Sequence, residues 1–361
     1  MKKLLILLVC GIVSAAMAEY NVGVYCDQGP EGIGAYEWFN LINGSPQMKL
    51  HLVDGADVRA GALEGIDLLV MPGGSSKKEY QSLKDEGMEK VRAFIRNGGG
   101  YLGTCAGCFL AVDRDSDPVN GKRMHVVPYT YKDCPQGTIF VKHKLTDEGK
   151  RALGMTNENW SVRFHGGTVM FPSTNAIEGA KFETWAKYVS DADRNKPVTE
   201  KNRMSGYDAI VGGTYGKGRV VVFGSHPEYY VSTVRLVDEA IQWILQDESV
   251  RTVRRYRKPG AKTVAFFTSV LGSKDAAEAA IRLNACDDYD VVPVDNEIVG
   301  YNFLEHVDMV VFPAGREEFT RRDASAIFKA YRAAGGKSLL HRPGADIVEE
   351  VRSAFAAFEA K

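Results

Sequence analysis

Short apolar runs alternate with amphipathic stretches over the first hundred residues of this chain, and the pattern returns further along. Runs of this length, bounded by turn residues, are typical of buried strands. The expected strands are Tyr20–Tyr25, Leu50–Val53, Ile66–Met71, Gly100–Thr104 and Gly218–Phe223, and the expected helices are Glu79–Asn97 and Val231–Gln246. Strands that alternate with helices predict a parallel sheet covered by helices on both faces.

A different pattern runs from about Asp113 to Ser205. Short polar–apolar alternations and turn residues replace the longer apolar runs. Alternation with a period of two indicates strands that have one solvated face. We therefore expect this segment to form an antiparallel insertion or an extension of the sheet.

The segment 250–262, VRTVRRYRKPGAK, is basic and contains a Pro-Gly pair. These features are typical of an interdomain linker. The alternative interpretation, a solvated basic segment at the surface, is also compatible with a linker. We do not interpret the run as a nucleic-acid site, because the chain as a whole is balanced in charge.

The residues after this linker resemble the first hundred. Met309–Gly315 parallels Leu68–Gly74, and a helix expected at Glu318–Ala334 leads to a second pair of glycines. When the glycine pairs are aligned, His341 falls at the position of Cys105. We interpret the segment as a smaller, degenerate α/β half-repeat without the thiol. The alternative is that any two α/β units share such a rhythm.

The first eighteen residues have the pattern of a secretory signal. Two lysines precede the apolar run Leu4–Val13, and a small-x-small sequence ends at Ala18. The run is too short to span a bilayer, so we expect cleavage near Ala18 and export to the periplasm or the exterior. A lipoprotein anchored through Cys10 is the less favoured alternative, because Val9 is larger than the residue usually found there.

Composition narrows the class of partner. The chain has 45 basic and 46 acidic residues and a formal net charge of -1. This balance argues against nucleic-acid partners, and the absence of a long apolar segment after residue 18 argues against stable membrane insertion. Five cysteines remain after the expected cleavage. An odd, sparse set predicts at least one free thiol rather than a disulfide scaffold.

The stretch Gly98–Gly107, GGGYLGTCAG, contains the most specific signal in the chain. It reads as a helix stop, a short strand and then Cys105 on a sharp turn between glycines. This is the thiol counterpart of the nucleophile elbow G-x-S-x-G. Such a turn leaves no room for larger neighbours, and a thiol at a helix N-terminus is favoured as the reactive thiolate. Cys105 is therefore the candidate nucleophile.

A nucleophilic cysteine needs a base, and the base needs an orienting group. The strand expected at Gly218–Phe223 is followed by Gly-Ser and then by His226, Pro227 and Glu228. Residues two apart in an extended segment point the same way, and proline keeps the preceding residue extended. Glu228 can thus orient His226. Since parallel strands end at one sheet edge, His226 and Cys105 can meet there.

These motifs, together with Pro72-Gly73-Gly74, resemble those of class I glutamine amidotransferase domains in order and spacing. The resemblance implies a flavodoxin-like, doubly wound, mostly parallel sheet. It also implies that Cys105 forms a thioester with an amide carbonyl while His226 acts as base and acid. The implied oxyanion hole uses the backbone N–H of Ala106 and one from Gly73 or Gly74.

A narrower resemblance covers about Tyr20 to Tyr229. LLVMPGGSSKKEY, GGGYLGTCAGCFLA, VRFHGG and GSHPE are similar to the N-terminal domain of biotin–protein ligases. We find no biotin-ligase catalytic motif in the sequence, so biotin transfer is not implied. An exported protein without a synthetase domain is expected to retain only the hydrolytic half of amidotransferase chemistry. The expected substrate is a small amide of unknown identity.

Other functions stay open. An inactive ligand-binding or scaffolding protein could use the same fold. A relative of the DJ-1/PfpI group would also place a cysteine on an elbow, but His226-Pro227-Glu228 argues against that group. Cys105 and Cys108 form a C-x-x-C pair, so Cys108 is a candidate redox partner that could silence Cys105 by oxidation.

Three further residues are candidates for the pocket. His165 and Gly166 could line it or simply form a turn between strands. Asp27 follows the first strand at the same sheet edge, where it could contact substrate or cap the next helix. His125, His143 and Cys134 lack metal-ligand spacing, and we expect neither a metal nor another cofactor.

The sequence thus predicts a signal peptide at 1–18, an amidotransferase-like domain at 19–249, a linker at 250–262 and a smaller α/β domain at 263–361. It does not indicate whether the protein forms oligomers or binds a partner protein.

Overall fold

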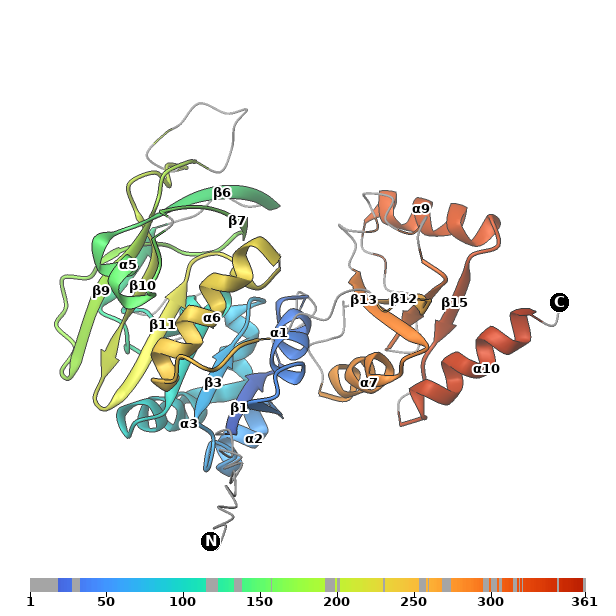
Figure 1. The fold of residues 1–361 in the computed structure, drawn as a ribbon, viewed down its shortest axis with the longest axis horizontal. Coiled ribbons are helices and arrows are strands. Elements are labelled where there is room, and N and C mark those ends of the chain that lie inside the picture. The colour runs from blue at the N-terminus through green and yellow to red at the C-terminus, as the bar shows by residue number, and fades with distance from the viewer. Residues whose placement is uncertain are drawn as a thin grey trace, which may run out of the picture.

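In the part of the chain that the structure describes, the strands form two sheets, one of eleven strands and one of four. The structure is a computed structural model, shown in Figure 1. It describes residues 19–27, 33–114, 123–132, 138–156, 158–191, 199, 202–229, 231–252, 258, 260–267, 274–294, 299, 304, 307–313, 317, 319, 321–342 and 344–359. The expected signal segment 1–18, with Cys10, and Cys134 lie outside the described residues.

One half of the large sheet is parallel. Its strand order is β2-β1-β3-β4-β11, and every neighbouring pair in this half is parallel. The strands are β1 (Tyr20–Tyr25), β2 (Met48–Val53), β3 (Leu68–Met71), β4 (Gly100–Thr104) and β11 (Gly218–Phe223). Strands β1, β4 and β11 have the expected bounds, whereas β2 begins two residues before the expected Leu50 and β3 begins two residues after the expected Ile66. Strands β3 and β4 are buried along their whole length. The expected flavodoxin-like α/β fold class is confirmed.

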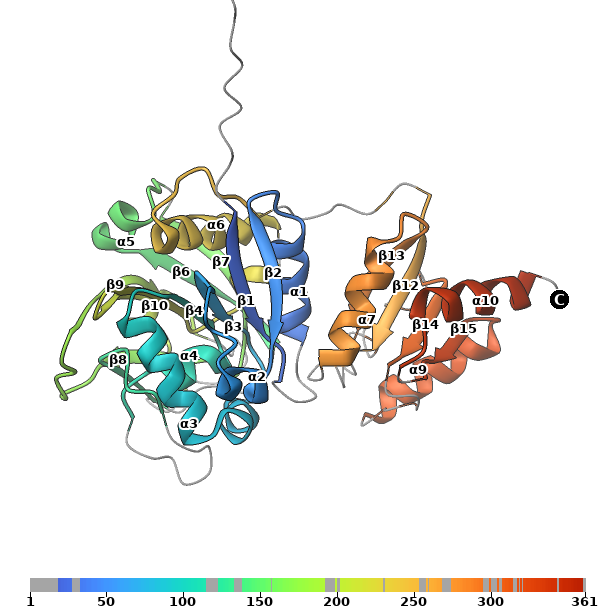
Figure 2. The same cartoon turned by 90° about the horizontal axis from the view of Figure 1, so that it is seen from below.

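Helices cover both faces of this half (Figure 2). The helices are α1 (Ile33–Asn43), α2 (Gly55–Ala60), α3 (Ser76–Arg96), α4 (Ala106–Ala111) and α6 (Val231–Leu245). Side chains of α1 and α6, such as Trp38 and Leu236, share one core cluster with Leu102. Side chains of α2, α3 and α4 share the other cluster with Tyr101. Since neighbouring residues of a strand point to opposite faces, β4 joins both cores.

The segment expected to be antiparallel extends the sheet beyond β11. Its order is β11-β10-β9-β6-β7, with β8 and β5 attached at β10, and these pairs are antiparallel. The elements are β5 (Tyr129–Lys132), β6 (Thr138–Leu145), α5 (Asp147–Ala152), β7 (Asn159–His165), β8 (Val169–Pro172), β9 (Ala180–Tyr188) and β10 (Asp208–Tyr215). The extension returns β7 to the edge where β11 ends, because Arg163 forms a bridge with His226.

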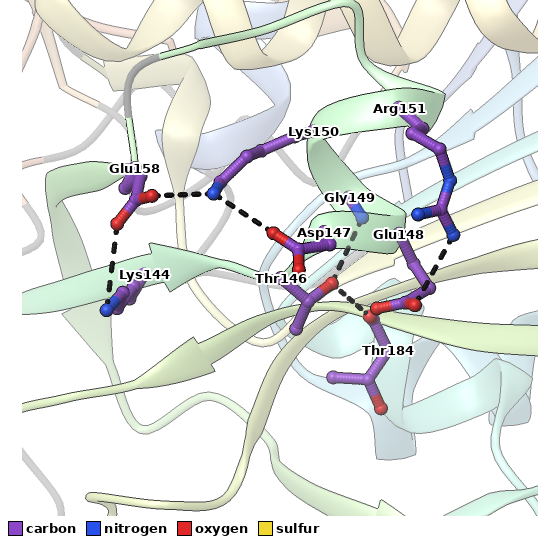
Figure 3. A network of polar contacts seen from close by, with 9 residues as sticks. All are labelled: Lys144, Thr146, Asp147, Glu148, Gly149, Lys150, Arg151, Glu158 and Thr184. Atoms are coloured by element: carbon purple, nitrogen blue, oxygen red, sulfur yellow. Dashed lines mark hydrogen bonds and ion pairs between the residues drawn. The ribbon is translucent and has the colours of Figure 1, made fainter.

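Helix α5 is fastened to the extension by a polar network (Figure 3). The N-cap residue Thr146 accepts a hydrogen bond from the Gly149 N–H at 3.0 Å and donates one to the Thr184 carbonyl at 2.7 Å. Lys150 pairs with Glu158 and Asp147 at the surface. The cap thus links the first turn of α5 directly to strand β9.

The second sheet is fully parallel, with the order β13-β12-β14-β15. Its elements are β12 (Lys262–Phe267), α7 (Lys274–Ala285), β13 (Tyr289–Val294), β14 (Met309–Phe312), α9 (Arg322–Ala333), β15 (Lys337–Leu340) and α10 (Ile347–Glu359). In chain order this arrangement is the same as β2-β1-β3-β4. Strand β15 therefore corresponds to β4, and His341 follows β15 as Cys105 follows β4.

The two sheets belong to units that pack against each other through α1, α7 and β13. The Tyr36 hydroxyl donates to the Val291 carbonyl at 3.2 Å, and Lys274 pairs with Asp57 at 2.8 Å. One core cluster contains buried side chains of both units. Among the helices that the structure describes, none is long and apolar enough to cross a membrane.

Candidate active site

Cys105 lies at the turn between β4 and α4, at the carboxyl edge of the parallel strands. Its backbone has φ 47° and ψ -99°, a conformation that residues with a side chain rarely adopt. Holding such a conformation costs about 1–3 kcal/mol, which the surrounding structure must supply. Hydrogen bonds from the Cys105 N–H to the Phe223 carbonyl and from the Gly107 N–H to the Pro72 carbonyl hold the turn.

The glycines beside Cys105 are required by close backbone contacts. A Cβ on Gly107 would lie 2.1 Å from the Met71 carbonyl oxygen, and one on Gly103 would lie 2.8 Å from the Gly107 carbonyl carbon. Neither distance is possible for a real side chain. The turn therefore packs directly against the end of β3, which explains the G-T-C-A-G pattern.

His226 and Glu228 form a buried pair just beyond β11. His226 Nδ1 lies 2.9 Å from Glu228 Oε1, and the exposed fractions of the two residues are 5% and 0%. Glu228 belongs to the short 3₁₀ segment η1 (Pro227–Tyr229), so the expected extended segment is wrong, although the two side chains still meet. Since Nδ1 engages the carboxylate, Nε2 is the ring nitrogen left to exchange a proton with a substrate or a thiol.

Glu228 itself is incompletely satisfied. Its Oε1 atom also lies 3.5 Å from the Thr104 hydroxyl, while its Oε2 atom has no hydrogen-bond partner among the residues that the structure describes. A buried carboxylate with a spare acceptor is suited to stabilising a positive charge on the neighbouring imidazole.

Gly73 brings the nucleophile and the base candidates to one point. A Cβ built on Gly73 would lie 2.3 Å from His226 Cε1 and 3.3 Å from Cys105 Cβ. Gly73 therefore lies close to both side chains. Of the three predicted oxyanion-hole residues, Gly73 and Ala106 are buried and Gly74 is half-buried. Gly73 lies near Cys105, and Ala106 follows Cys105 in the chain.

The candidate pocket residues lie at different depths. The Cys105 Sγ atom is 3.7 Å from the His165 carbonyl oxygen, so the protonated thiol donates to this carbonyl. The His165 side chain is exposed, and Gly166 has φ 58° in the turn after β7. This segment is thus both a turn and, through its backbone, a wall beside the thiol.

Asp27 is directed toward helix α3, where it contacts the Ser82 hydroxyl. It lies near Glu79, a fully buried acid whose two carboxyl oxygens have no hydrogen-bond partner in the described part of the chain. Burial raises the pKa of Glu79 well above its usual range, opposed by Arg123 and reinforced by Asp27. The residues that follow Asp27, where a helix cap would form, lie outside the described range.

Cys108 is part of the core rather than of the open edge. It is fully buried, and its sulfur accepts a hydrogen bond from the Thr168 hydroxyl at 3.0 Å and contacts Met170 Sδ at 3.4 Å. Burial raises the pKa of the Cys108 thiol to about 12. Cys105 and Cys108 are both free thiols in the structure. A high pKa and two core contacts make Cys108 a poor resolving thiol.

Two residues at this site escaped the sequence reasoning. The Arg163 guanidinium lies 4.1 Å from the centre of the Tyr229 ring, and that ring meets His226 edge to face. The His226 N–H also donates to the Arg163 carbonyl at 2.8 Å. Tyr229 directly follows the His-Pro-Glu motif, and Arg163 lies two residues before His165. Nearness to these motifs is the one feature of the sequence that could have indicated the two residues.

Metal binding finds no support in the described residues, which contain no cluster of three or more His, Cys, Asp or Glu side chains suited to an ion. Of the histidines that lacked metal-ligand spacing, His125 pairs with Asp113 and His143 is enclosed in the sheet extension.

Comparison with known proteins identifies relatives of this chain. A family model described as biotin-protein ligase, N terminal, matches residues 63–274. The biotin–protein ligase of Schizosaccharomyces pombe is 25% identical over 187 residues, covering 48% of this chain and 27% of the ligase. The pyridoxal 5'-phosphate synthase subunit PdxT of Corynebacterium jeikeium is 47% identical over 60 residues, which cover 16% of this chain and 31% of that subunit.

The chain therefore spans less than a third of the length of these two curated relatives. Among solved structures, a ThuA-like protein from Bacteroides uniformis has a TM-score of 0.45 and 13% identity, covering 66% of this chain and 96% of that protein.

Proposed function

Because this chain belongs to the biotin-protein ligase N-terminal family, we propose that it uses the α/β scaffold of that family as a cysteine-dependent amide hydrolase. The observation that carries the proposal is the convergence at Gly73 of the Cys105 elbow and the buried His226–Glu228 pair. We further propose that the hydrolase acts after export, as the pattern of residues 1–18 indicates. The proposed substrate is a small amide.

In the proposed reaction, His226 removes the proton of the Cys105 thiol as the sulfur attacks the amide carbonyl carbon. The carbonyl oxygen becomes an oxyanion, which the N–H groups of Ala106 and of Gly73 or Gly74 would stabilise. Collapse of this intermediate breaks the C–N bond, and the imidazolium returns its proton to the departing amine. The product of this half-reaction is a thioester on Cys105.

Water then attacks the thioester carbonyl, and His226 takes one proton from that water. The C–S bond breaks, a carboxylic acid leaves, and the proton returns to the sulfur. Glu228 holds the imidazole orientation in both halves and balances its transient positive charge.

The reactivity of Cys105 tests this proposal without knowledge of the substrate. Iodoacetamide labelling at pH 6, read residue by residue by mass spectrometry, should modify Cys105 faster than Cys286, the half-buried thiol of the second unit. His226→Ala should slow the labelling of Cys105 at least tenfold. His341→Ala is the matched control, because His341 also pairs with a carboxylate, Glu350 at 2.6 Å, in the second unit.

Labelling of Cys105 no faster than that of Cys286, and insensitive to His226→Ala, would contradict the proposal and favour an inactive ligand-binding protein on this fold. If Cys105 instead reacts as expected, a screen of small amides for hydrolysis by the wild type and by Cys105→Ala would identify the substrate. Release of acid and amine by the wild type alone is the expected result.

A further inference from the structure

The Tyr229 ring packs against the His226 imidazole. The two ring centroids lie 5.3 Å apart, and the rings meet edge to face at an angle of 90°. Such contacts are favourable because the positive edge of one ring meets the negative face of the other. Tyr229 directly follows Glu228 in η1, so one short turn carries both the carboxylate and the ring that contact the imidazole.

The contact with Tyr229 adds a constraint that the carboxylate alone does not provide. The hydrogen bond between Nδ1 and Glu228 Oε1 fixes one atom of the imidazole, and it leaves the ring able to turn about the line that joins the two atoms. A neighbouring ring restricts that rotation, since tilting the imidazole would break the edge-to-face contact. The plane of His226, and with it the direction of Nε2, therefore depends on where the Tyr229 ring lies.

Arg163 holds the Tyr229 ring in turn. Its guanidinium carbon lies 4.1 Å from the centre of that ring, and Arg163 is only 7% exposed. A cation over an aromatic face is attracted by the electrons of the ring, and more strongly where water is excluded. Because Tyr229 is only half-buried, the guanidinium supplies restraint that burial alone would not.

Strand β7 fixes the position of Arg163. Its neighbours in the strand, Val162 and Phe164, are fully buried in one core cluster. The Arg163 carbonyl accepts the His226 N–H at 2.8 Å, and these two residues form a β-bridge. Arg163 therefore contacts the candidate base through its backbone and, by way of Tyr229, through its side chain.

The same strand also reaches the candidate nucleophile. Two residues after Arg163, the His165 carbonyl oxygen lies 3.7 Å from the Cys105 Sγ atom. We propose that Arg163 and Tyr229 are positioning residues: the guanidinium fixes the Tyr229 ring, and this ring fixes the imidazole plane so that Nε2 is directed at the thiol. This inference rests on the proposed function, because the direction of Nε2 matters only if His226 exchanges a proton with Cys105.

Iodoacetamide labelling of Cys105 at pH 6 tests the proposal, with Cys286 of the same molecule as the internal reference for the reagent. Tyr229→Leu removes the ring and should slow the labelling of Cys105 at least about fivefold, because a misdirected base removes the proton poorly. Tyr229→Phe keeps the ring and should be labelled at nearly the wild-type rate. Arg163→Met keeps an unbranched side chain without the charge and should slow labelling at least about threefold.

Arg123→Met is the matched control for the loss of a buried guanidinium. Arg123 is 4% exposed, and its guanidinium carbon lies 5.8 Å from the centre of the Tyr131 ring, in a stack that does not include His226. The control should lower the free energy of unfolding in urea without changing the labelling of Cys105. A purely structural role of Arg163 predicts the same behaviour, so equal labelling of the two arginine variants would overturn the proposal.

The double variant Arg163→Met/Tyr229→Leu shows whether the two residues act in series. Once the ring is removed, the guanidinium has no ring to fix, so the double variant should be labelled no more slowly than Tyr229→Leu. Rate losses that multiply would show two independent roles and would also overturn the proposal.

His226→Ala separates this proposal from the proposed function. If His226→Ala slows labelling and neither Arg163→Met nor Tyr229→Leu does, the positioning role is wrong and the hydrolase proposal stands. If labelling is insensitive to His226→Ala, the proposed function fails and the positioning role fails with it. Each single variant tests one end of the stack, so a variant that does not fold leaves the other to decide.

Discussion

Cys105 has a backbone conformation that only a closely packed turn can maintain, with φ 47° and ψ -99°. The turn is enclosed by backbone from β3 and β11, which leaves the thiol fixed relative to both. The same packing leaves no room for a side chain at Gly103 or Gly107. A side chain at Gly103 or Gly107 would meet backbone and should cost stability, whereas one at Gly73 would first meet the His226 ring.

Gly73→Ala should disable the site without unfolding the protein. The new methyl group would lie 2.3 Å from His226 Cε1, so the imidazole must move. We expect the labelling of Cys105 by iodoacetamide to slow at least tenfold. Gly23→Ala is the control, because a Cβ at Gly23 makes ordinary contacts of 3.5 Å or more. Equal labelling of the two variants would contradict the proposed role of Gly73.

His143 predicts a loss of stability in acid. This residue of β6 is fully buried, both ring nitrogens lack hydrogen-bond partners among the described residues, and its ring meets Tyr188 edge to face. Burial lowers the pKa of His143 from 6.5 to about 3. As the pH falls below 6.5, the unfolded chain takes up a proton that the folded protein refuses until about pH 3.

This linkage should remove about 2 kcal/mol of stability between pH 7 and pH 5. His143→Leu should abolish that part of the pH dependence, whatever its effect on the free energy of unfolding at neutral pH. Urea unfolding at pH 7 and pH 5 measures both quantities. A wild type and a variant whose stabilities change in parallel would contradict the prediction.

At the scale of elements, Thr146 should matter more than the ion pairs around it. Its hydroxyl caps α5 and binds β9, so Thr146→Ala should lower the free energy of unfolding by about 1–2 kcal/mol. Thr146→Ser keeps both hydrogen bonds and should lose much less. Lys150→Met breaks only surface ion pairs and should change stability little. Chemical denaturation of the three variants distinguishes these effects.

The elements of the parallel half could be predicted because their signals are local. Buried runs such as Leu68–Met71 are apolar throughout, and Asn97-Gly98 is a local signal for the end of α3. For the extension, the sequence predicted antiparallel strands but not their order in the sheet. Its strand order depends on pairings between distant segments, such as β6 with β9, that no local pattern specifies.

The same distinction applies to the candidate site. The glycines around Cys105 indicate the elbow, and the short spacing of His226 and Glu228 indicates the pair, although a 3₁₀ turn rather than an extended segment brings these two side chains together. The contacts of Arg163 with Tyr229 and of the His165 carbonyl with Cys105 exist because β7 returns to the end of β11. Sequence spacing alone carries no information on that return.

At the scale of the whole molecule, the second sheet has the same strand order as β2-β1-β3-β4, and its origin as a degenerate half-repeat stays a prediction. The packing of the two units could not be predicted, because it depends on which outer faces of α1 and α7 meet. Those faces bury side chains in one shared core cluster. A shared core implies that the units unfold together rather than separately.

Calorimetry should therefore show one cooperative transition for the intact chain, with equal calorimetric and van't Hoff enthalpies. Tyr36→Phe should weaken the coupling, because it leaves the buried Val291 carbonyl without its donor at a cost of about 1–2 kcal/mol. Tyr331→Phe is the matched control, since the Tyr331 hydroxyl bonds to Val307 and Lys337 within the second unit. The control should lower stability while the transition stays single, whereas Tyr36→Phe should broaden or split it. Two separate transitions in the unmodified protein would show that the contact between the units does not couple their folding.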